Sequence, residues 1–138
     1  MMEVVLVDID GTIALRGDRA PHDHDSSMED GVNWPVVKVC KALHNSGYGV
    51  VLISGRDEKY RDVTEYWLGA HNIFPHRLQL IMRQRKDNRP DEIVKRELYE
   101  QFVKPNYDVF AVLDDRNKVV KMWRELGLTC LQVAEGDF

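Results

Sequence analysis

The chain has 138 residues, of which 43% are hydrophobic and 30% are charged, a composition typical of one globular domain. Nineteen basic and 23 acidic residues give a net charge of −4, which excludes a uniformly basic nucleic-acid-binding surface but not a local basic patch. Apolar runs reach about five residues, far fewer than the roughly 20 that span a bilayer, so no membrane segment is predicted.

The N-terminal segment and the cysteines predict a cytosolic protein. The stretch from Met1 to Asp8 has no basic residue and reaches an acidic one too early for a secretion signal. Cys40 and Cys130 form no Cys-x-x-Cys pair and have no histidine spacing typical of zinc. We therefore expect two reduced thiols.

Short apolar runs alternate with segments of helical period along the chain. Val4–Val7 is a continuous apolar run, typical of a strand that is covered on both faces. Residues 11–32 show no clear period and contain glycine, proline and acidic residues, which indicates a long excursion. Further strands are predicted at 48–53, 78–82, 109–113 and 128–133, and helices at 34–46, 60–68, 91–102 and 117–126.

This alternation predicts a single α/β domain over residues 1–138 with a five-stranded parallel sheet. The periodicity also predicts which side chains pack inward. In the 91–102 helix these are Ile93, Val94, Leu98 and Phe102. The helical spacing around the three tryptophans, Trp34, Trp67 and Trp123, favours core packing over stacking on nucleic-acid bases.

Polar residues gather at the carboxyl ends of the predicted strands, where parallel α/β sheets bind their ligands. Asp8 and Asp10 follow the first strand, Ser54 and Arg56 end the second, and the Asp114-Asp115 pair ends the fourth. Lys95 lies on the helix before that fourth strand. Four carboxylates that converge on one face repel each other unless a cation neutralises them, and such hard oxygen ligands suit Mg²⁺.

This residue set is typical of phosphate chemistry. A carboxylate can attack phosphorus to form an aspartyl-phosphate, and a second carboxyl group can protonate the leaving oxygen and later deprotonate water. Gly11 permits the tight exit from the first strand. A Ser-Gly turn, an Asp-Asp pair or a single lysine is by itself explained by an ordinary structural role. Phosphate chemistry is indicated only because all of them occur together, each at the expected place and in this order along the chain.

The sequence resembles phosphatases of the haloacid dehalogenase superfamily, whose four motifs match Asp8-x-Asp10-Gly11-Thr12, Ser54, Lys95 and Asp114-Asp115. It is similar in particular to the 3′-phosphatase domain of phage-type polynucleotide kinase-phosphatases over essentially the whole chain. The stretches that carry this similarity are 51–56, 82–85, 114–124 and 132–138. The resemblance implies a three-layer Rossmann-like fold with strand order 5-4-1-2-3, numbered along the chain, and a minimal cap.

The resemblance also implies roles for individual residues. Asp8 would be the nucleophile, and Asp10 the general acid and base that lends its backbone carbonyl to Mg²⁺. Asp114 and Asp115 would anchor the metal, with Asp115 favoured as the direct ligand, and Asp8 would be a further ligand. Lys95 would steady the charge of phosphate and nucleophile. The residues expected around the substrate are Arg19, Ser54, Gly55, Arg56 and Asp91.

A basic cluster follows the third predicted strand, at Arg83, Arg85, Lys86 and Arg89. It is either a track for a nucleic-acid backbone or an ordinary solvated loop. The segments between the motifs leave room for only a small lid over the site. A small lid would leave the cleft open, and an open cleft suits the end of a polymer. The expected substrates are therefore DNA or RNA 3′-ends, including 2′,3′-cyclic phosphate by resemblance, with a separate or fused polynucleotide kinase or ligase as a partner.

Other functions stay open from the sequence. One alternative is a nucleotidase or small-metabolite phosphatase with the same chemistry. Another is a signalling receiver domain, which the order of the acidic motifs along the chain disfavours. No Gly-x-x-x-x-Gly-Lys-Ser/Thr loop occurs, so no kinase domain and no 5′-kinase activity are expected. The run His22–Asp25 matches no motif and is either a solvated loop or a second metal site.

Overall fold

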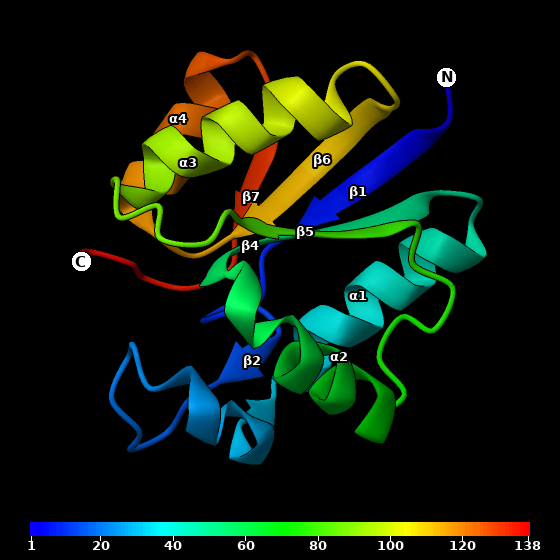
Figure 1. Ribbon diagram of the computed structural model, residues 1–138. Coiled ribbons are helices and arrows are strands. Elements are labelled where there is room, and N and C mark those ends of the chain that lie inside the picture. The colour runs from blue at the N-terminus through cyan, green and yellow to red at the C-terminus, as the bar shows by residue number, and fades with distance from the viewer.

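The computed structural model describes residues 1–138 and is built around a five-stranded parallel sheet (Figure 1). Its strands lie in the order β5-β4-β1-β6-β7, with every neighbouring pair parallel. Numbered along the chain without two short strands outside the sheet, this order reads 5-4-1-2-3 from the β7 edge. The five strands are β1 (Glu3–Val7), β4 (Gly49–Asp57), β5 (Gln79–Arg83), β6 (Asp108–Asp114) and β7 (Cys130–Gln132).

The central strand β1 shows why the sheet needs cover on both sides. Val4 to Val7 are completely buried, and successive side chains point to opposite faces. Val5 and Val7 pack into one core, and Val4 and Leu6 pack into the other. A continuous apolar run is therefore stable only between two layers of helices, as the sequence predicted.

Four helices supply those layers (Figure 1). α1 (Trp34–Asn45) and α2 (Arg61–Ala70) contribute Cys40 and Trp67 to the core that holds Val5. α3 (Asp91–Leu98) and α4 (Asn117–Glu125) contribute Val94 and Trp123 to the core on the other face. None of the helices has the length and apolar character needed to cross a membrane.

The predicted 91–102 helix is confirmed as helical, but its second half is not α-helical. α3 ends at Leu98 and continues as a π-helical turn over Tyr99–Val103. The inward face is centred on Val94, Lys95 and Leu98, so Ile93 lies outside it and is 44% exposed. The helix turns Lys95 rather than Ile93 inward because the lysine finds buried carboxylates at the end of the sheet.

The tryptophans divide in a way that periodicity did not predict. Trp67 and Trp123 are buried, and their indole N–H groups donate to Asp30 O (2.9 Å) and Asp114 Oδ2 (3.2 Å). Trp34 is 46% exposed because it is the first residue of α1, at the end of the helix rather than along its packed face. The prediction of core packing is wrong for Trp34.

The excursion between β1 and α1 contains short regular elements. β2 (Ala14–Leu15) pairs antiparallel with β3 (Gly31–Val32), and a 3-10 helix, η1 (His24–Glu29), lies between them. Figure 1 shows this excursion beside α2, below the carboxyl ends of the strands. It therefore forms a wall at the edge of the sheet where the sequence places its polar residues.

Candidate active site

The carboxyl ends of β1, β4 and β6 bring the predicted polar residues together. Asp8, Ser54 and Asp114 come from these three ends, Asp115 follows β6, and Lys95 enters from α3. All five are buried, with at most 5% of their surface exposed. Because parallel strands end at one edge, residues up to 107 positions apart in the sequence (8 and 115) share one small volume.

Lys95 is the cation of this cluster. Its Nζ donates to Asp8 Oδ1 at 2.7 Å and to Asp114 Oδ2 at 3.2 Å, and lies 3.7 Å from Asp91 Oδ2. Burial alone would lower the pKa of Lys95, but the charges of Asp114, Asp8 and Asp91 raise it well above its ordinary value. The ammonium group is therefore held in its charged form.

One lysine does not balance the carboxylates around it. Oxygens of Asp8, Asp114 and Asp115 lie within 4.8 Å of one another. Burial, followed by the charge of Asp114, raises the pKa of Asp8 well above its usual range, and the same two causes raise the pKa of Asp115. A buried group of hard oxygen donors with excess negative charge fits a small divalent cation such as Mg²⁺.

Asp114 and Asp115 differ in how many of their oxygens are already used. Asp114 Oδ1 accepts the backbone N–H groups of Asp115 (2.8 Å) and Arg116 (3.3 Å), and its Oδ2 accepts from Lys95 and Trp123. Asp115 accepts none of these bonds, and Asp114 instead holds it in place. Of the two, Asp115 has the carboxylate free to approach a cation directly.

Gly11 is required where the chain leaves β1. It has a φ of +80°, and a Cβ there would overlap the Asp115 carboxylate. Beside it, Thr12 Oγ1 donates to Asp8 Oδ2 at 2.8 Å. The Gly-Thr pair thus gives the Asp115 carboxylate room beside the strand end and orients the Asp8 carboxylate.

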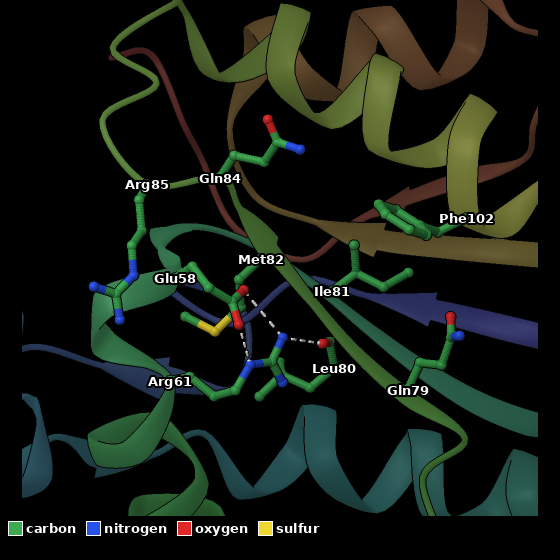
Figure 2. A pocket seen from close by; sticks show the side chains of 9 residues that line it. All are labelled: Glu58, Arg61, Gln79, Leu80, Ile81, Met82, Gln84, Arg85 and Phe102. Atoms are coloured by element: carbon green, nitrogen blue, oxygen red, sulfur yellow. Dashed lines mark hydrogen bonds and ion pairs between the residues drawn. The ribbon is translucent and has the colours of Figure 1, made fainter.

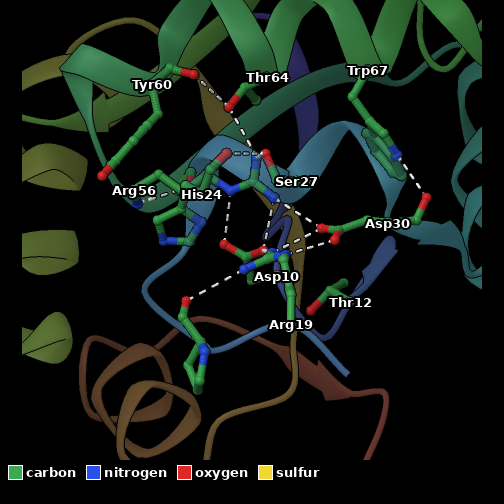
Figure 3. A network of polar contacts seen from close by, with 12 residues as sticks. Asp10, Thr12, Arg19, His24, Ser27, Asp30, Arg56, Tyr60, Thr64 and Trp67 are labelled. Atoms are coloured by element: carbon green, nitrogen blue, oxygen red, sulfur yellow. Dashed lines mark hydrogen bonds and ion pairs between the residues drawn. The ribbon is translucent and has the colours of Figure 1, made fainter. Parts of the chain in front are cut away.

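Asp10 does not belong to the acidic cluster and points toward two arginines, as Figure 3 shows for the arginines. Arg56 donates from Nε to Oδ2 (2.9 Å) and from Nη2 to Oδ1 (2.8 Å), and Arg19 Nη2 donates to Oδ1 (3.2 Å). Burial alone would raise the pKa of Asp10, but the hydrogen bonds and charge of Arg56, with His24 and Arg19, lower it. Asp8 and Asp10 thus stand in opposite electrostatic environments, two residues apart.

Asp30 organises these arginines and was not predicted. It accepts from Arg19 Nε (2.6 Å) and Nη2 (2.8 Å), and Arg56 Nη2 lies 3.4 Å from its Oδ2. Arg56 Nη1 also donates to Thr64 Oγ1 at 2.9 Å. Asp30 is only 4% exposed, yet the sequence around it carries no motif, so only its pairing in three dimensions identifies it.

Gly55 and Asp91 meet on the other side of Ser54. Ser54 Oγ accepts the Arg56 backbone N–H at 3.0 Å, and a Cβ on Gly55 would overlap Oδ1 of Asp91. Asp91 lies near three cations, Arg83 (3.2 Å), Lys95 (3.7 Å) and Arg116 (3.9 Å). Its carboxylate therefore connects the site to the basic loop that follows β5.

That loop has fewer free cations than the sequence suggested. Arg83 donates to the carbonyls of Gly55 (2.7 Å), Asp87 (3.0 Å) and Arg89 (2.6 Å), so it supports the loop from inside. Arg89 pairs with Asp87 and Glu97. Arg85 and Lys86 are exposed and make no ion pair, so the predicted four-residue cluster offers two free positive charges.

A pocket of about 540 Å³ lies beside the edge strand β5 (Figure 2). Leu80 to Met82 line it together with Phe102, and Arg61 Nη2 donates to Leu80 O at 2.8 Å. None of the cluster carboxylates reaches it. The chemistry therefore belongs to the buried polar groups at the strand ends rather than to this largely apolar hollow.

Comparisons with known proteins agree with this geometry. Residues 2–138 match the family described as the polynucleotide kinase PNKP phosphatase domain. A putative bifunctional polynucleotide kinase/RNA ligase of Autographa californica nuclear polyhedrosis virus is 33% identical over 124 residues, 88% of this chain and 18% of that protein.

Two solved structures are similar over 99% of this chain. In the Pnkp1/Rnl/Hen1 complex one chain is 42% identical with a TM-score of 0.94, and 47% of that chain is covered. In the Pnkp1/Rnl/Hen1 RNA repair complex the values are 42%, 0.95 and 44%. The chain thus spans less than half of these structural relatives and under a fifth of the viral one.

Proposed function

Because the chain belongs to the polynucleotide kinase PNKP phosphatase-domain family and is therefore a phosphoric monoester hydrolase, we propose that it removes 3′-phosphates from nucleic-acid ends with Mg²⁺. The observation that carries this proposal is the buried Asp8–Lys95 ion pair (2.7 Å) beside Asp114 and Asp115. The Asp8 carboxylate is held by one ammonium group and lies beside two further carboxylates that could bind a metal ion. This arrangement suits the attack of Asp8 on a charged phosphate. The 138 residues would act as one phosphatase unit without kinase chemistry.

In the first step, Asp8 would attack phosphorus while the bond to the 3′-oxygen breaks. Arg56 and Arg19 lower the pKa of Asp10 in the free site, so Asp10 would take up a proton as the substrate phosphate draws these arginines away, and would then give that proton to the leaving oxygen. In the second step, Asp10 takes a proton from water, which attacks phosphorus and releases inorganic phosphate and free Asp8. Asp8, Asp115 and the Asp10 backbone carbonyl, with Asp114 behind them, would hold Mg²⁺, which neutralises phosphate charge when bound.

The remaining polar residues fit the binding of the phosphate. Ser54 and Lys95 would face the phosphoryl group, and Lys95 keeps its charge in this site. Arg19 and Arg56 would share their hydrogen bonds between Asp10 and the substrate, with Asp30 holding both guanidinium groups. Gly55 and Asp91 would shape the floor of the phosphate site. Arg83 would support this floor rather than contact the nucleic acid.

The proposed substrate class rests on the small size of the segment that could cover the site. The β2–η1–β3 excursion would serve as a minimal cap, since no other insertion of comparable length interrupts the fold. Such a site can admit a polymer end, with Arg85 and Lys86 along the backbone path. Terminal 2′,3′-cyclic phosphate would be a further substrate. We place this activity in the cytosol, in keeping with the free thiols Cys40 and Cys130.

The relatives also suggest partners. One is a putative kinase and RNA ligase in a single chain, and two are parts of Pnkp1/Rnl/Hen1 assemblies. We therefore propose that this phosphatase works with a polynucleotide kinase or ligase, fused or separate. Removing a 3′-phosphate leaves the 3′-hydroxyl that strand joining requires.

The test is phosphate release from RNA and DNA oligonucleotides that carry a 3′-phosphate. We expect release with Mg²⁺, none with EDTA and none with Asp8→Ala. Equal release by Asp8→Ala, or none by the unaltered protein, would contradict the proposal. Nucleoside 3′-monophosphates run in parallel identify the alternative: a preference for them over oligonucleotides would mark a nucleotidase instead.

A further inference from the structure

His24 belongs to the one polar run that no motif explained, and the structure holds it firmly in place. Its ring meets the Tyr60 ring edge-on, with centroids 5.1 Å apart and planes at 62°. Its backbone carbonyl accepts a hydrogen bond from Ser27 Oγ at 2.6 Å, and Arg56 Nη1 donates to the same hydroxyl at 3.3 Å. His24 is thus connected through the Ser27 hydroxyl to Arg56, the arginine that donates two hydrogen bonds to Asp10.

The two ring nitrogens of His24 have different surroundings. Nδ1 is buried and has no hydrogen-bond partner, whereas Nε2 makes no hydrogen bond within the chain and is not among the fully buried unpaired atoms. An unpaired buried acceptor is tolerated better than an unpaired buried N–H group. The favoured neutral tautomer therefore carries its proton on Nε2. Burial lowers the pKa of His24, which favours this neutral form.

The position of His24 is on the leaving-group side of the site. Asp8 attacks from one side of phosphorus, so the 3′-oxygen leaves on the opposite side, where Asp10 must reach it. Figure 3 shows the His24 imidazole next to the Asp10 carboxylate, between it and Tyr60, and the two groups interact electrostatically. If Asp10 protonates the 3′-oxygen, a free donor beside Asp10 would lie near the sugar that carries this oxygen.

We propose that His24 is a specificity-determining residue whose Nε2–H donates a hydrogen bond to the 2′-oxygen of the terminal ribose. This inference rests on the proposed function. A ribose offers an oxygen next to the 3′-position, whereas a deoxyribose offers none there, so the donor distinguishes RNA ends from DNA ends. A site with a donor placed for a substrate oxygen loses that bond when the oxygen is missing.

The test uses one RNA oligonucleotide with a 3′-phosphate and a second that differs only in a 2′-deoxy terminal nucleotide. One neutral hydrogen bond predicts that kcat/KM is about fivefold higher for the ribose end. His24→Phe keeps an aromatic ring against Tyr60 and should bring this ratio close to one. His24→Gln keeps an N–H donor and should retain part of the preference, and the exposed neighbour variant His22→Phe should keep all of it.

The ratio is measured within each variant, so a smaller folded fraction does not change it. An unchanged ratio in His24→Phe, or equal rates for the two ends in the unaltered enzyme, would show that His24 only packs against Tyr60. If the unaltered protein releases phosphate from neither end, the proposed function itself fails and the inference falls with it.

Discussion

Lys95 Nζ lies 2.7 Å from Asp8 Oδ1, and both side chains are almost fully buried. The two residues are 87 positions apart, on α3 and at the end of β1. Burying either charge alone would be costly, and each makes the burial of the other tolerable. The stability of the fold therefore depends on the charges of two residues that belong to the site.

Replacing Lys95 by methionine should destabilise the fold, because it leaves the buried carboxylates of Asp8 and Asp114 without their cation. We expect the free energy of unfolding, measured by urea denaturation in EDTA, to fall by about 3–5 kcal/mol. The matched control is Lys38→Met on the exposed face of α1, which should stay within about 0.5 kcal/mol. Equal stabilities of the two variants would contradict this role.

Asp30→Asn should impair catalysis although Asp30 touches no reacting atom. Without its charge, Arg19 and Arg56 lose the carboxylate that orients them toward Asp10. We expect kcat/KM on 3′-phosphorylated RNA to fall by about 10- to 100-fold, as for other misplaced site groups. Asp23→Asn, on the exposed part of the same excursion, is the control and should keep full activity. A fully active Asp30→Asn would remove the positioning role.

Gly55→Ala should be inactive or nearly so. A Cβ at this position overlaps the Asp91 carboxylate, which would have to move away from Arg83 and Lys95. Gly69 in α2 has open space around it, so Gly69→Ala should leave activity unchanged and stabilise the helix by up to about 1 kcal/mol. Thermal melting and phosphate release distinguish the two variants, and similar activities would show that the strand end can relax.

The two cysteines should resist alkylation in the native protein. Burial raises the pKa of Cys40 and of Cys130 to about 12, so almost no thiolate exists at pH 8. Mass spectrometry after iodoacetamide treatment should find both thiols unmodified until urea unfolds the chain. Modification of the native protein at the unfolded rate would show that the thiols are accessible.

The same two thiols should make the free energy of unfolding fall as the pH rises above the ordinary cysteine pKa. Their pKa values are raised on folding, so the folded state holds its thiol protons more strongly than the unfolded chain. This contribution is fully present below the ordinary cysteine pKa of about 8.5 and is lost as the pH rises toward about 12. Cys40→Ala should flatten the fall in stability in this range, and an unchanged slope would contradict it.

The sequence by itself determined the strands, the two-sided burial of β1 and the edge at which Asp8, Ser54 and Asp114 meet. Apolar runs specify buried strands, and parallel strands place their carboxyl ends together, so residues at those ends become neighbours whatever their separation. These features follow from local patterns, and local patterns are visible in one sequence.

The partners of the long charged side chains were decided only by the tertiary structure. Arg83 donates to three carbonyls, and Asp30 binds Arg19 and Arg56. Lys95 is buried, whereas Ile93, which periodicity placed inward, is exposed. A flexible charged side chain can reach several partners, and the one it pairs with depends on which charges the fold buries nearby. That choice is absent from the sequence pattern because it depends on which groups the fold places nearby, for instance Asp8, which is 87 positions from Lys95.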